Sequence, residues 1–406
     1  MGGKTIAVLA TLDTKGVEAQ FIREQITEAG NAAVVIDAGV TGEPKCSPDI
    51  TREAVAREGG VELSDLLENP TRERSAPVMA LGATRHVLRL YEEGKIDGII
   101  AMGGTQGTTL CTAVMRELPY GFPKVMVSTM ASGNVAPWVD IKDITMMFSV
   151  ADIFGLNPVT RKILANAAGA VCGMAESDIT LEKQEKPLVA VTTVGITTKG
   201  AMKACEVLKQ AGYETIVFHA IGPGGRAMEQ MMKEGLIGAV LDYSTIEVSN
   251  WLFDALLNGG EERCTWGGKL GIPQVFAPGA IEVMVYNEPE TVPPPFNTRR
   301  LVRHSPKITD VRLDTDEMKQ TAEELAKRLA HTKTPSSFMI PLKGFDSYDV
   351  PGGEFWDPAA DRAFVETLIK GIPKNIEVVQ RDCNIEDPEF AQECAEKLIE
   401  LIKGRG

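Results

Sequence analysis

The feature that most constrains the fold is a repeat of the chain's early segments in its second half. Residues 4–16 recur as residues 186–200, with two additional residues before a shared Thr-Lys-Gly. Further matches follow in the same order: Ala29-Gly30 with Ala211-Gly212, residues 34–38 with 216–220, Glu93-Gly94 with Glu234-Gly235, and residues 123–127 with 273–277. A repeat of this length predicts two similar doubly wound α/β halves, which we place at residues 1–180 and 181–406.

Apolar runs and helical periodicity supply the expected elements of each half. In the first half we expect strands at residues 4–10, 33–38, 99–102, 124–129 and 144–150, and helices at 17–29, from 49 to 93 with breaks near Pro70 and Pro77, after Gly107, and from 157 to about 170. After a basic linker that begins at Pro293, we expect helices at residues 316–329, 359–368 and 388–402 and strands at 337–342 and 376–381.

A glycine-rich turn follows the third expected strand and is the best candidate for a ligand site. It reads Gly103-Gly104-Thr105-Gln106-Gly107-Thr108, and we expect the next helix to be capped at Thr108 or Thr109. Glycines let backbone amides approach a ligand, and the positive end of a helix favours an anion, so phosphate is the simplest ligand. The turn is neither a P-loop nor a dinucleotide fingerprint. The alternative is that its glycines serve only the packing of strand against helix.

The loop after the first strand should lie beside the glycine turn, because both follow neighbouring strands of one sheet. It contains Asp13, Thr14 and Lys15. Lys15 is suited to hold a phosphate, and Asp13 to hold Mg²⁺ or act on a proton. The alternative is that Asp13 or Thr14 caps the first helix. We also include Gly133, from the loop after the fourth strand, in the expected nucleotide site.

The second half lacks the glycine turn, since Asp242–Glu247 replaces it. Lys199 corresponds to Lys15, and we expect it to meet a second ligand in a cleft between the two domains. Asp242 and Glu247 are candidate acid–base or metal groups, or helix caps. Arg299, Arg300, Arg303 and His304 form a basic patch that suits a carboxylate or phosphate, or is a solvated charge run. The aromatic and acidic loop at residues 344–357 is expected to be a lid or substrate wall.

Composition narrows the class of partner. A net charge of −14 argues against binding to nucleic acid or to a membrane surface, because both need a basic face. Seven widely spaced cysteines without a C-x-x-C pair indicate reduced thiols in the cytoplasm. The N-terminal apolar run is too short to span a membrane. Neither a zinc-protease motif nor a nucleophile elbow is present.

Several motifs together resemble one protein family. They are residues 11–16, 37–40, 102–108, 128–133, 198–200 and 278–280. The chain resembles the bacterial, fungal and plant family whose plant member inhibits tobamovirus RNA replication. The resemblance implies an ATP-binding, Rossmann-like N-terminal domain, a second α/β domain, a homodimer, and a partner protein similar to TIM-barrel phosphoenolpyruvate hydrolases. Where the family pattern has Asp after residues 278–281, this chain has Glu282. The glycine turn is also similar to the Gly-Gly-Asp-Gly-Thr loop of phosphofructokinase-like and lipid kinases, with Thr105-Gln106 in place of Asp.

Two functions fit these observations. The first is an ATP-dependent enzyme of kinase or ligase type that uses Mg²⁺ and acts on a small anionic metabolite, with Asp13, Lys199 and Glu247 in catalysis and Arg299, Arg300 and His304 on the substrate. The second is a non-catalytic nucleotide-binding protein that regulates or binds a partner.

Overall fold

The computed structural model describes residues 3–177, 179 and 185–404 of the 406-residue chain. The chain divides into two compact units, Met1–Leu181 and Glu182–Gly406, which we call the first and second units. Each unit is an α/β domain with a parallel sheet, so the predicted fold class is confirmed.

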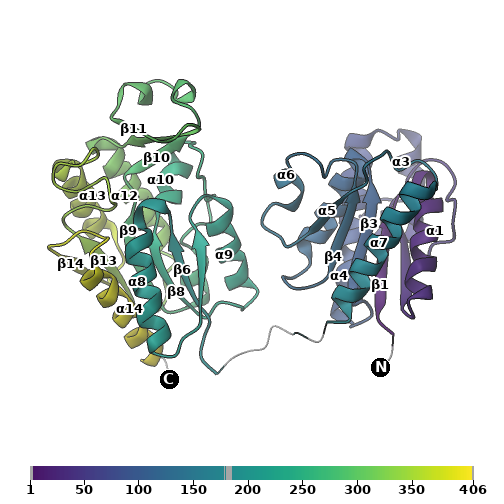
Figure 1. The fold of residues 1–406 in the computed structure, drawn as a ribbon, viewed down its shortest axis with the longest axis horizontal. Coiled ribbons are helices and arrows are strands. Elements are labelled where there is room, and N and C mark those ends of the chain that lie inside the picture. The colour runs from purple at the N-terminus through teal and green to yellow at the C-terminus, as the bar shows by residue number, and fades with distance from the viewer. Residues whose placement is uncertain (1–2, 178, 180–184, 405–406) are drawn as a thin grey trace. The chain divides into compact units, whose positions relative to one another are not determined.

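The first unit is built on a five-stranded parallel sheet in the order β2-β1-β3-β4-β5 (Figure 1). Its strands are β1 (Thr5–Ala10), β2 (Ala32–Asp37), β3 (Gly98–Gly103), β4 (Lys124–Ser128) and β5 (Thr145–Phe148). Its helices are α1 (Leu12–Glu28), α2 (Arg52–Glu58), α3 (Leu63–Glu68), α4 (Arg72–Glu92), α5 (Thr105–Glu117), α6 (Ala136–Val139) and α7 (Pro158–Ala175). The chain order reverses between β1 and β3, and ligands of open α/β sheets bind at the carboxyl ends of the strands at such a point.

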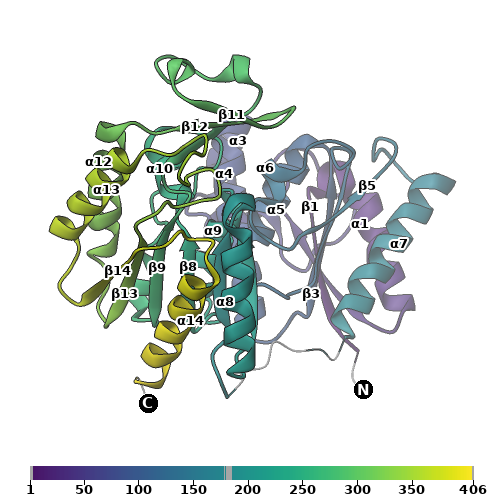
Figure 2. The same cartoon turned by 60° about the vertical axis from the view of Figure 1, so that its left-hand side comes forward.

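Both faces of this sheet are covered, as the alternation along β1 shows. Ile6 and Val8 pack with α1 and α7 on one face, whereas Ala7 and Leu9 pack with α2–α5 on the other. The views in Figures 1 and 2 show these two helical layers. Because β1 and β3 are followed by helices on opposite faces, their carboxyl ends leave room for a crevice.

The second unit contains a six-stranded parallel sheet in the order β14-β13-β9-β8-β6-β7 and a three-stranded antiparallel sheet in the order β10-β12-β11. The strands are β6 (Val189–Thr193), β7 (Thr215–His219), β8 (Ala239–Ser244), β9 (Gln274–Gly279), β10 (Val283–Tyr286), β11 (Leu301–Ser305), β12 (Ile308–Arg312), β13 (Ser336–Pro341) and β14 (Ile376–Arg381). The helices are α8 (Thr198–Gln210), α9 (Pro223–Lys233), α10 (Ile246–Leu252), α11 (Trp266–Leu270), α12 (Thr315–Leu329), α13 (Pro358–Gly371) and α14 (Pro388–Lys403), and three short 3₁₀ turns lie at Gly195–Thr197, Pro289–Thr291 and Phe296–Thr298. The partial order β7-β6-β8-β9 repeats β2-β1-β3-β4, as the internal repeat predicts.

Three expectations about local structure were wrong. Helix α5 begins at Thr105, so Gln106 and Gly107 belong to its first turn, where a free amide end tolerates glycine. Helix α4 continues through Pro77, because burial of other residues on this helix outweighs the lost backbone bond. The basic segment after Pro293 is no simple linker, since Leu301–Ser305 forms the edge strand of the antiparallel sheet.

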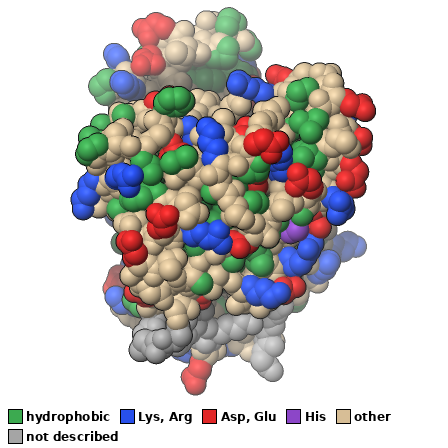
Figure 3. Space-filling model, turned by 90° about the vertical axis from the view of Figure 1, so that its right-hand side faces the viewer, with side chains coloured by type: hydrophobic (Ala, Val, Ile, Leu, Met, Phe, Trp, Pro, Cys, Tyr) green, Lys and Arg blue, Asp and Glu red, His purple; other side chains and the backbone are tan. Residues whose placement is uncertain are grey.

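The surface charges and the lengths of the apolar helices can be compared with the expectations from composition. On the face shown in Figure 3, Lys and Arg side chains are interspersed with Asp and Glu side chains. No helix within the described part of the chain combines the length and the apolar character needed to cross a membrane.

Candidate functional site

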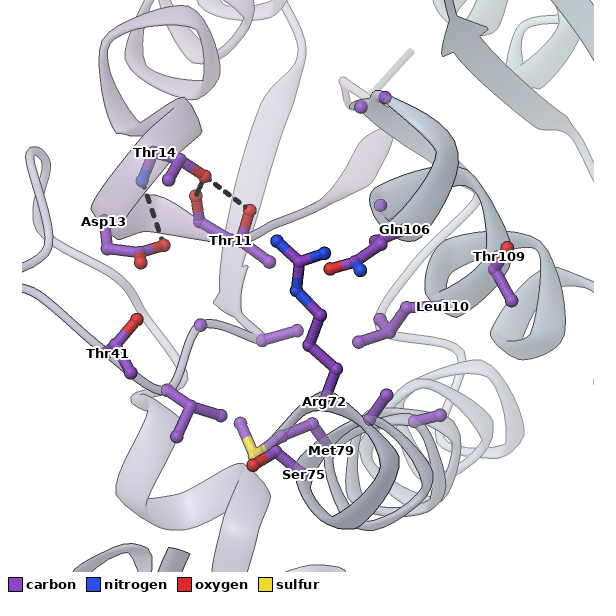
Figure 4. A pocket seen from close by; sticks show the side chains of 18 of the residues that line it. Thr11, Asp13, Thr14, Thr41, Arg72, Ser75, Met79, Gln106, Thr109 and Leu110 are labelled. Atoms are coloured by element: carbon purple, nitrogen blue, oxygen red, sulfur yellow. Dashed lines mark hydrogen bonds between the residues drawn. The ribbon is translucent and has the colours of Figure 1, made fainter. Parts of the chain in front are cut away.

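A cavity of about 1060 Å³ lies in the first unit at the carboxyl ends of β1 and β3 (Figure 4). Four segments contribute its walls: residues 11–15 after β1, 38–41 after β2, 70–80 at the start of α4, and 103–113 at the start of α5. The structure thus brings together Asp13, Thr14 and Lys15 with the glycine turn, at the point where the strand order reverses.

The amino end of α5 faces this cavity without a cap. Gly104 is the N-cap residue and so offers no side chain to the helix, and the first turn carries no acidic residue. Within the described residues, the amides of Thr105, Gln106 and Gly107 donate no hydrogen bond. By contrast, α7 and α12 are closed by capping boxes at Asn157 and Asp314. Helix α5 therefore presents free amides and the positive end of its dipole to the cavity.

The three glycines of the turn have different reasons to be there. A Cβ on Gly103 would lie 2.8 Å from Gly107 Cα, so Gly103 is needed for packing. A Cβ on Gly104 would meet only Thr129 Oγ1, at 3.7 Å, and one on Gly107 only the Met102 carbonyl, at 3.5 Å. Neither residue has a positive φ. Packing of the strand against the helix thus explains the glycine at position 103. The fold does not require glycine at positions 104 and 107, which line the cavity.

The other predicted residues of the turn divide into two groups. Thr105 and Gln106 line the cavity. Thr108 is buried, and its hydroxyl bonds the Gly104 carbonyl at 2.9 Å and Ser128 Oγ at 2.7 Å, so it anchors the turn to β4. Gly133 is not among the lining residues, and its amide closes a turn on the Met130 carbonyl.

Two carboxylates approach each other at the edge of the cavity. Asp13 Oδ1 accepts from the Thr14 amide at 2.9 Å, and Asp37 Oδ1 accepts from the amides of Leu12 at 3.0 Å and Gly39 at 2.8 Å. A Cβ on Gly39 would lie 3.0 Å from Asp37 Oδ1 and 3.1 Å from Asp13 Oδ1, so both carboxylates border one point. Asp37 Oδ2 is buried without a partner.

The environment of Asp37 is that of a group that needs a cation or a proton. Burial raises the pKa of Asp37, the two amides and Arg52 lower it, and Asp13 raises it further. Among the described residues, no three His, Cys, Asp or Glu side chains are grouped to hold a metal. An ion beside Asp13 and Asp37 would therefore complete its shell with ligand phosphate and water, as Mg²⁺ does in many nucleotide sites.

The cavity is lined by Lys15, the cation that we expected, and also by Arg72. The Lys15 ammonium donates to the carbonyl of Ile153, between β5 and α7, and is engaged there. Arg72, the first residue of α4, instead extends its guanidinium between Thr11 and Gln106 (Figure 4). Sequence reasoning missed Arg72, because its helix belongs to an insertion between strands, and the only signal was a basic residue at an expected helix start.

The remaining wall of the cavity is apolar and comes from α4, α5 and the loop after β2. Its residues are Val40, Pro77, Met79, Ala80, Leu110 and Ala113. Among them lies Ser75, which is 7% exposed and whose hydroxyl has no hydrogen-bond partner. The site thus combines an anion-binding end with an apolar slot that holds one unsatisfied polar group.

In the second unit, Glu247 has a structural role in place of the expected acid–base role. Its buried carboxylate accepts from the amides of Gly222 at 2.6 Å and Gly225 at 3.1 Å and from Arg263 Nε at 2.6 Å. Burial raises the pKa of Glu247, and Arg263 counteracts this. Arg263 is also fully buried and binds both oxygens of Asp242. This ion-pair cluster joins β8 to the start of α10, the elements that correspond to β3 and α5.

Lys199 and the basic patch do not converge on one ligand. Lys199 is exposed, and the Glu386 carboxylate accepts from the Gly200 amide at 3.1 Å, so the protein's own anion occupies the amino end of α8. Arg299 lies 2.6 Å from Asp314 and 2.8 Å from Glu317, while Arg300 lies 2.5 Å from Asp357. His304 Nδ1 lies 3.3 Å from the Tyr348 hydroxyl. The two arginines stabilise the starts of α12 and α13, which replaces their expected substrate contact.

The loop at residues 344–357 is largely packed inside the unit, unlike a lid. Asp346 and Asp349 are buried close to Glu282 and Asp361, and Arg312 is the cation paired with Asp361. Both oxygens of Glu282 lack a hydrogen-bond donor. Burial raises the pKa of Asp346 to about 7 and that of Asp361 to about 8, and the pKa of Glu282 lies well above its usual value. This cluster of carboxyl groups therefore gives up its protons at higher pH than isolated carboxyl groups do.

Comparison with known proteins agrees with the predicted family. The Uncharacterised protein family (UPF0261) matches in both of its parts, the N-terminal domain over residues 4–180 and the C-terminal domain over residues 186–402. The chain belongs to this family. A UPF0261 protein of Clostridium tetani is 42% identical over 401 residues, which cover 98% of this chain and 99% of that protein. A UPF0261 protein of Rhizobium meliloti is 38% identical over 391 residues, which cover 96% and 97%.

A plant relative of this UPF0261 protein also matches. The ToMV resistance protein Tm-1(GCR237) of Solanum lycopersicum is 32% identical over 317 residues, which cover 76% of this chain and 42% of the tomato protein. Among solved structures, UDP-N-acetylglucosamine 2-epimerase from Rickettsia bellii aligns over 100% of this chain and 97% of its own, with 9% identity and a TM-score of 0.23. A similarity this weak carries no inference about function.

Proposed function

We propose that the first unit binds ATP, with the polyphosphate on the amino end of α5. The observation that carries the proposal is the pair Gly104 and Gly107, which face the cavity and which the fold does not require to be glycines. Bare backbone beside free helix amides suits a phosphate that must approach closely. The apolar walls between α4 and α5 suit the nucleobase.

Mg²⁺ would bind between the phosphate and the carboxylates of Asp13 and Asp37. Asp37 Oδ2 is a buried acceptor without a donor, and Asp13 lies beside the same glycine. A divalent ion there would neutralise both carboxylates and orient the phosphate. The alternative role for Asp13, in place of metal binding, is to accept a proton from an attacking hydroxyl group.

The reaction we propose is ATP-dependent transfer of kinase or ligase type to a small anionic metabolite in the cytoplasm. Phosphoryl transfer depends mainly on positioning and on charge neutralisation, which free helix amides, a metal and an arginine supply. All seven cysteines are free thiols, as a reducing compartment requires. A homodimer and a TIM-barrel partner stay predictions.

A second function is supported by a separate observation. Of the three residues expected to act in catalysis, Glu247 is committed to a buried ion pair and Lys199 lies at a helix end that Glu386 occupies. A nucleotide-binding protein that regulates a partner needs no acid–base group in the second unit. The tomato relative is a ToMV resistance protein, and resistance to a virus also suits an interaction protein.

Two measurements on the full chain separate these functions. Calorimetric titration with ATP, with and without Mg²⁺, tests binding, and phosphate release with a panel of small carboxylic acids tests turnover. Binding with acid-dependent turnover supports the enzyme, whereas binding without turnover supports the regulatory protein. If ATP does not bind in either condition, the proposed function is wrong.

A further inference from the structure

Helix α4 presents one face to the cavity of the first unit. The lining residues on this helix include Arg72, Ser75, Met79 and Ala80, and this spacing is that of neighbours on one side of a helix. Exposure decreases along this face, from the exposed Arg72 to Ser75 at 7% and Met79 at 1%. Met79 lies seven positions after Arg72, about 10 Å along the helix. The wall therefore runs from a charged end to a buried apolar end.

In the part of the chain that the structure describes, Arg72 and Arg74 both lack the partners that Arg52 and Arg89 have, but Arg72 lines the cavity and Arg74 does not. Arg52 on α2 bonds the Gly42 carbonyl and lies 3.4 Å from Glu53, and Arg89 at the other end of α4 lies 2.6 Å from Glu58. Within the described residues, Arg72 has no ion pair and no hydrogen bond. Its guanidinium points across the cavity toward Gln106, in the first turn of α5 (Figure 4). An arginine held opposite free amides is a suitable second contact for a phosphate.

Ser75 provides an independent observation. Its side chain is more than nine-tenths buried, it lines the cavity, and its hydroxyl has no partner. Serine in a helix can also donate to the carbonyl one turn earlier, as Thr112 does to the Thr108 carbonyl at 2.7 Å, but the Ser75 hydroxyl makes no such bond. Buried polar groups nearly always find a partner in the protein, in water or in a ligand, so this hydroxyl in the cavity wall is available to a ligand atom.

We infer that α4 is the recognition wall for the nucleotide: Arg72 binds the phosphates opposite α5, and the Ser75 hydroxyl bonds the polar edge of the base, which packs between Met79 and Leu110. This inference rests on the proposed ATP binding. It assigns to Arg72 the charge that Lys15 was expected to supply, and it places the base at the buried end of the cavity.

The test uses three ligands that separate the two ends of the nucleotide. ATP, inorganic tripolyphosphate and adenosine are titrated against the full chain and the variants Arg72→Ala, Ser75→Ala and Arg74→Ala. Arg74 is the matched control, because it is exposed on the same helix and does not line the cavity. Thermal unfolding without ligand checks each variant, and Ser75→Ala should be as stable as the parent, since its hydroxyl has no partner to lose.

Arg72→Ala is expected to weaken ATP and tripolyphosphate about 10- to 100-fold and to leave adenosine unchanged. Ser75→Ala is expected to weaken ATP and adenosine about 5- to 10-fold and to leave tripolyphosphate unchanged. Arg74→Ala should match the parent for all three ligands.

If the parent binds ATP but Arg72→Ala has the same affinities as Arg74→Ala, the inference is wrong while the proposed ATP binding stands. The same holds if Ser75→Ala weakens the binding of tripolyphosphate as much as that of adenosine. If the parent binds neither ATP nor tripolyphosphate, the proposed function fails with the inference.

Discussion

Substitution of Gly104 by valine separates binding from folding more cleanly than other changes in the glycine turn. In the folded protein without ligand, a Cβ at this position would meet only Thr129 Oγ1 at 3.7 Å. The backbone there is extended, with φ −79° and ψ −164°, which a β-branched residue adopts readily. No side-chain cap is lost, because glycine provides none. We therefore expect the free energy of unfolding to change by less than about 1 kcal/mol.

The cost to binding follows from what the added side chain displaces. A phosphate on the first turn of α5 accepts charge-assisted bonds from the amides of Thr105, Gln106 and Gly107, each contributing about 1.5–3 kcal/mol. A valine side chain that pushes the phosphate away from two of these amides would remove about 3–6 kcal/mol, or roughly 10²- to 10⁴-fold in ATP affinity.

The assay is calorimetric titration with ATP beside urea unfolding of the same preparation. Gly103→Ala is the matched control, because its Cβ would lie 2.8 Å from Gly107 Cα and should lower stability directly. A folded Gly104→Val protein with the ATP affinity of the parent would refute the assignment of the phosphate to α5.

Three further predictions concern charged groups. Lys15→Ala should lower ATP affinity less than about threefold, because the ammonium bonds the Ile153 carbonyl; a titration showing a loss as large as that of Arg72→Ala would return Lys15 to the phosphate site. Arg263→Met should lower the free energy of unfolding in urea by about 3–5 kcal/mol, since Asp242 and Glu247 would be left buried without their cation, and an unchanged urea midpoint would contradict this. The pKa values of Asp346 (about 7), Asp361 (about 8) and Glu282 are raised in the folded state. Above about pH 4 the folded state therefore binds more protons than the unfolded state, and the free energy of unfolding should fall as the pH rises through 8. The amide in Glu282→Gln does not titrate, so the urea midpoint of this variant should fall less between pH 5.5 and 8.5 than that of the parent. Parallel pH profiles for the two proteins would contradict a raised pKa of Glu282.

The fold was predictable because its signals are local and repeated. Each buried parallel strand is an apolar run, and the internal repeat carries the strand order of the first unit into the second. The antiparallel sheet was missed, because β11 is an exposed edge strand with three charged or polar residues in Leu301–Ser305, so it lacks a strong apolar pattern.

The candidate site was predictable in part for the same reason. The glycine turn and Asp13 follow neighbouring strands, and that alone brings them together. The direction of a long side chain is not local information, so the sequence did not show that the Lys15 ammonium bonds the Ile153 carbonyl or that Arg72 lines the cavity. Glu247 was misread because its partner Arg263 lies 16 residues further along the chain and reaches it only in the folded unit.

Amide exchange tests the central claim most directly, because it reports on the free amides of α5 themselves. The full chain is labelled in deuterated buffer with and without ATP and Mg²⁺, and exchange is followed residue by residue or in short peptides across the glycine turn. Binding of the phosphate at α5 predicts that Thr105, Gln106 and Gly107 become protected, while the amides of residues 246–248, at the start of the corresponding helix α10 in the second unit, do not change. Saturating ATP with unchanged exchange at Thr105–Gly107 would contradict the account.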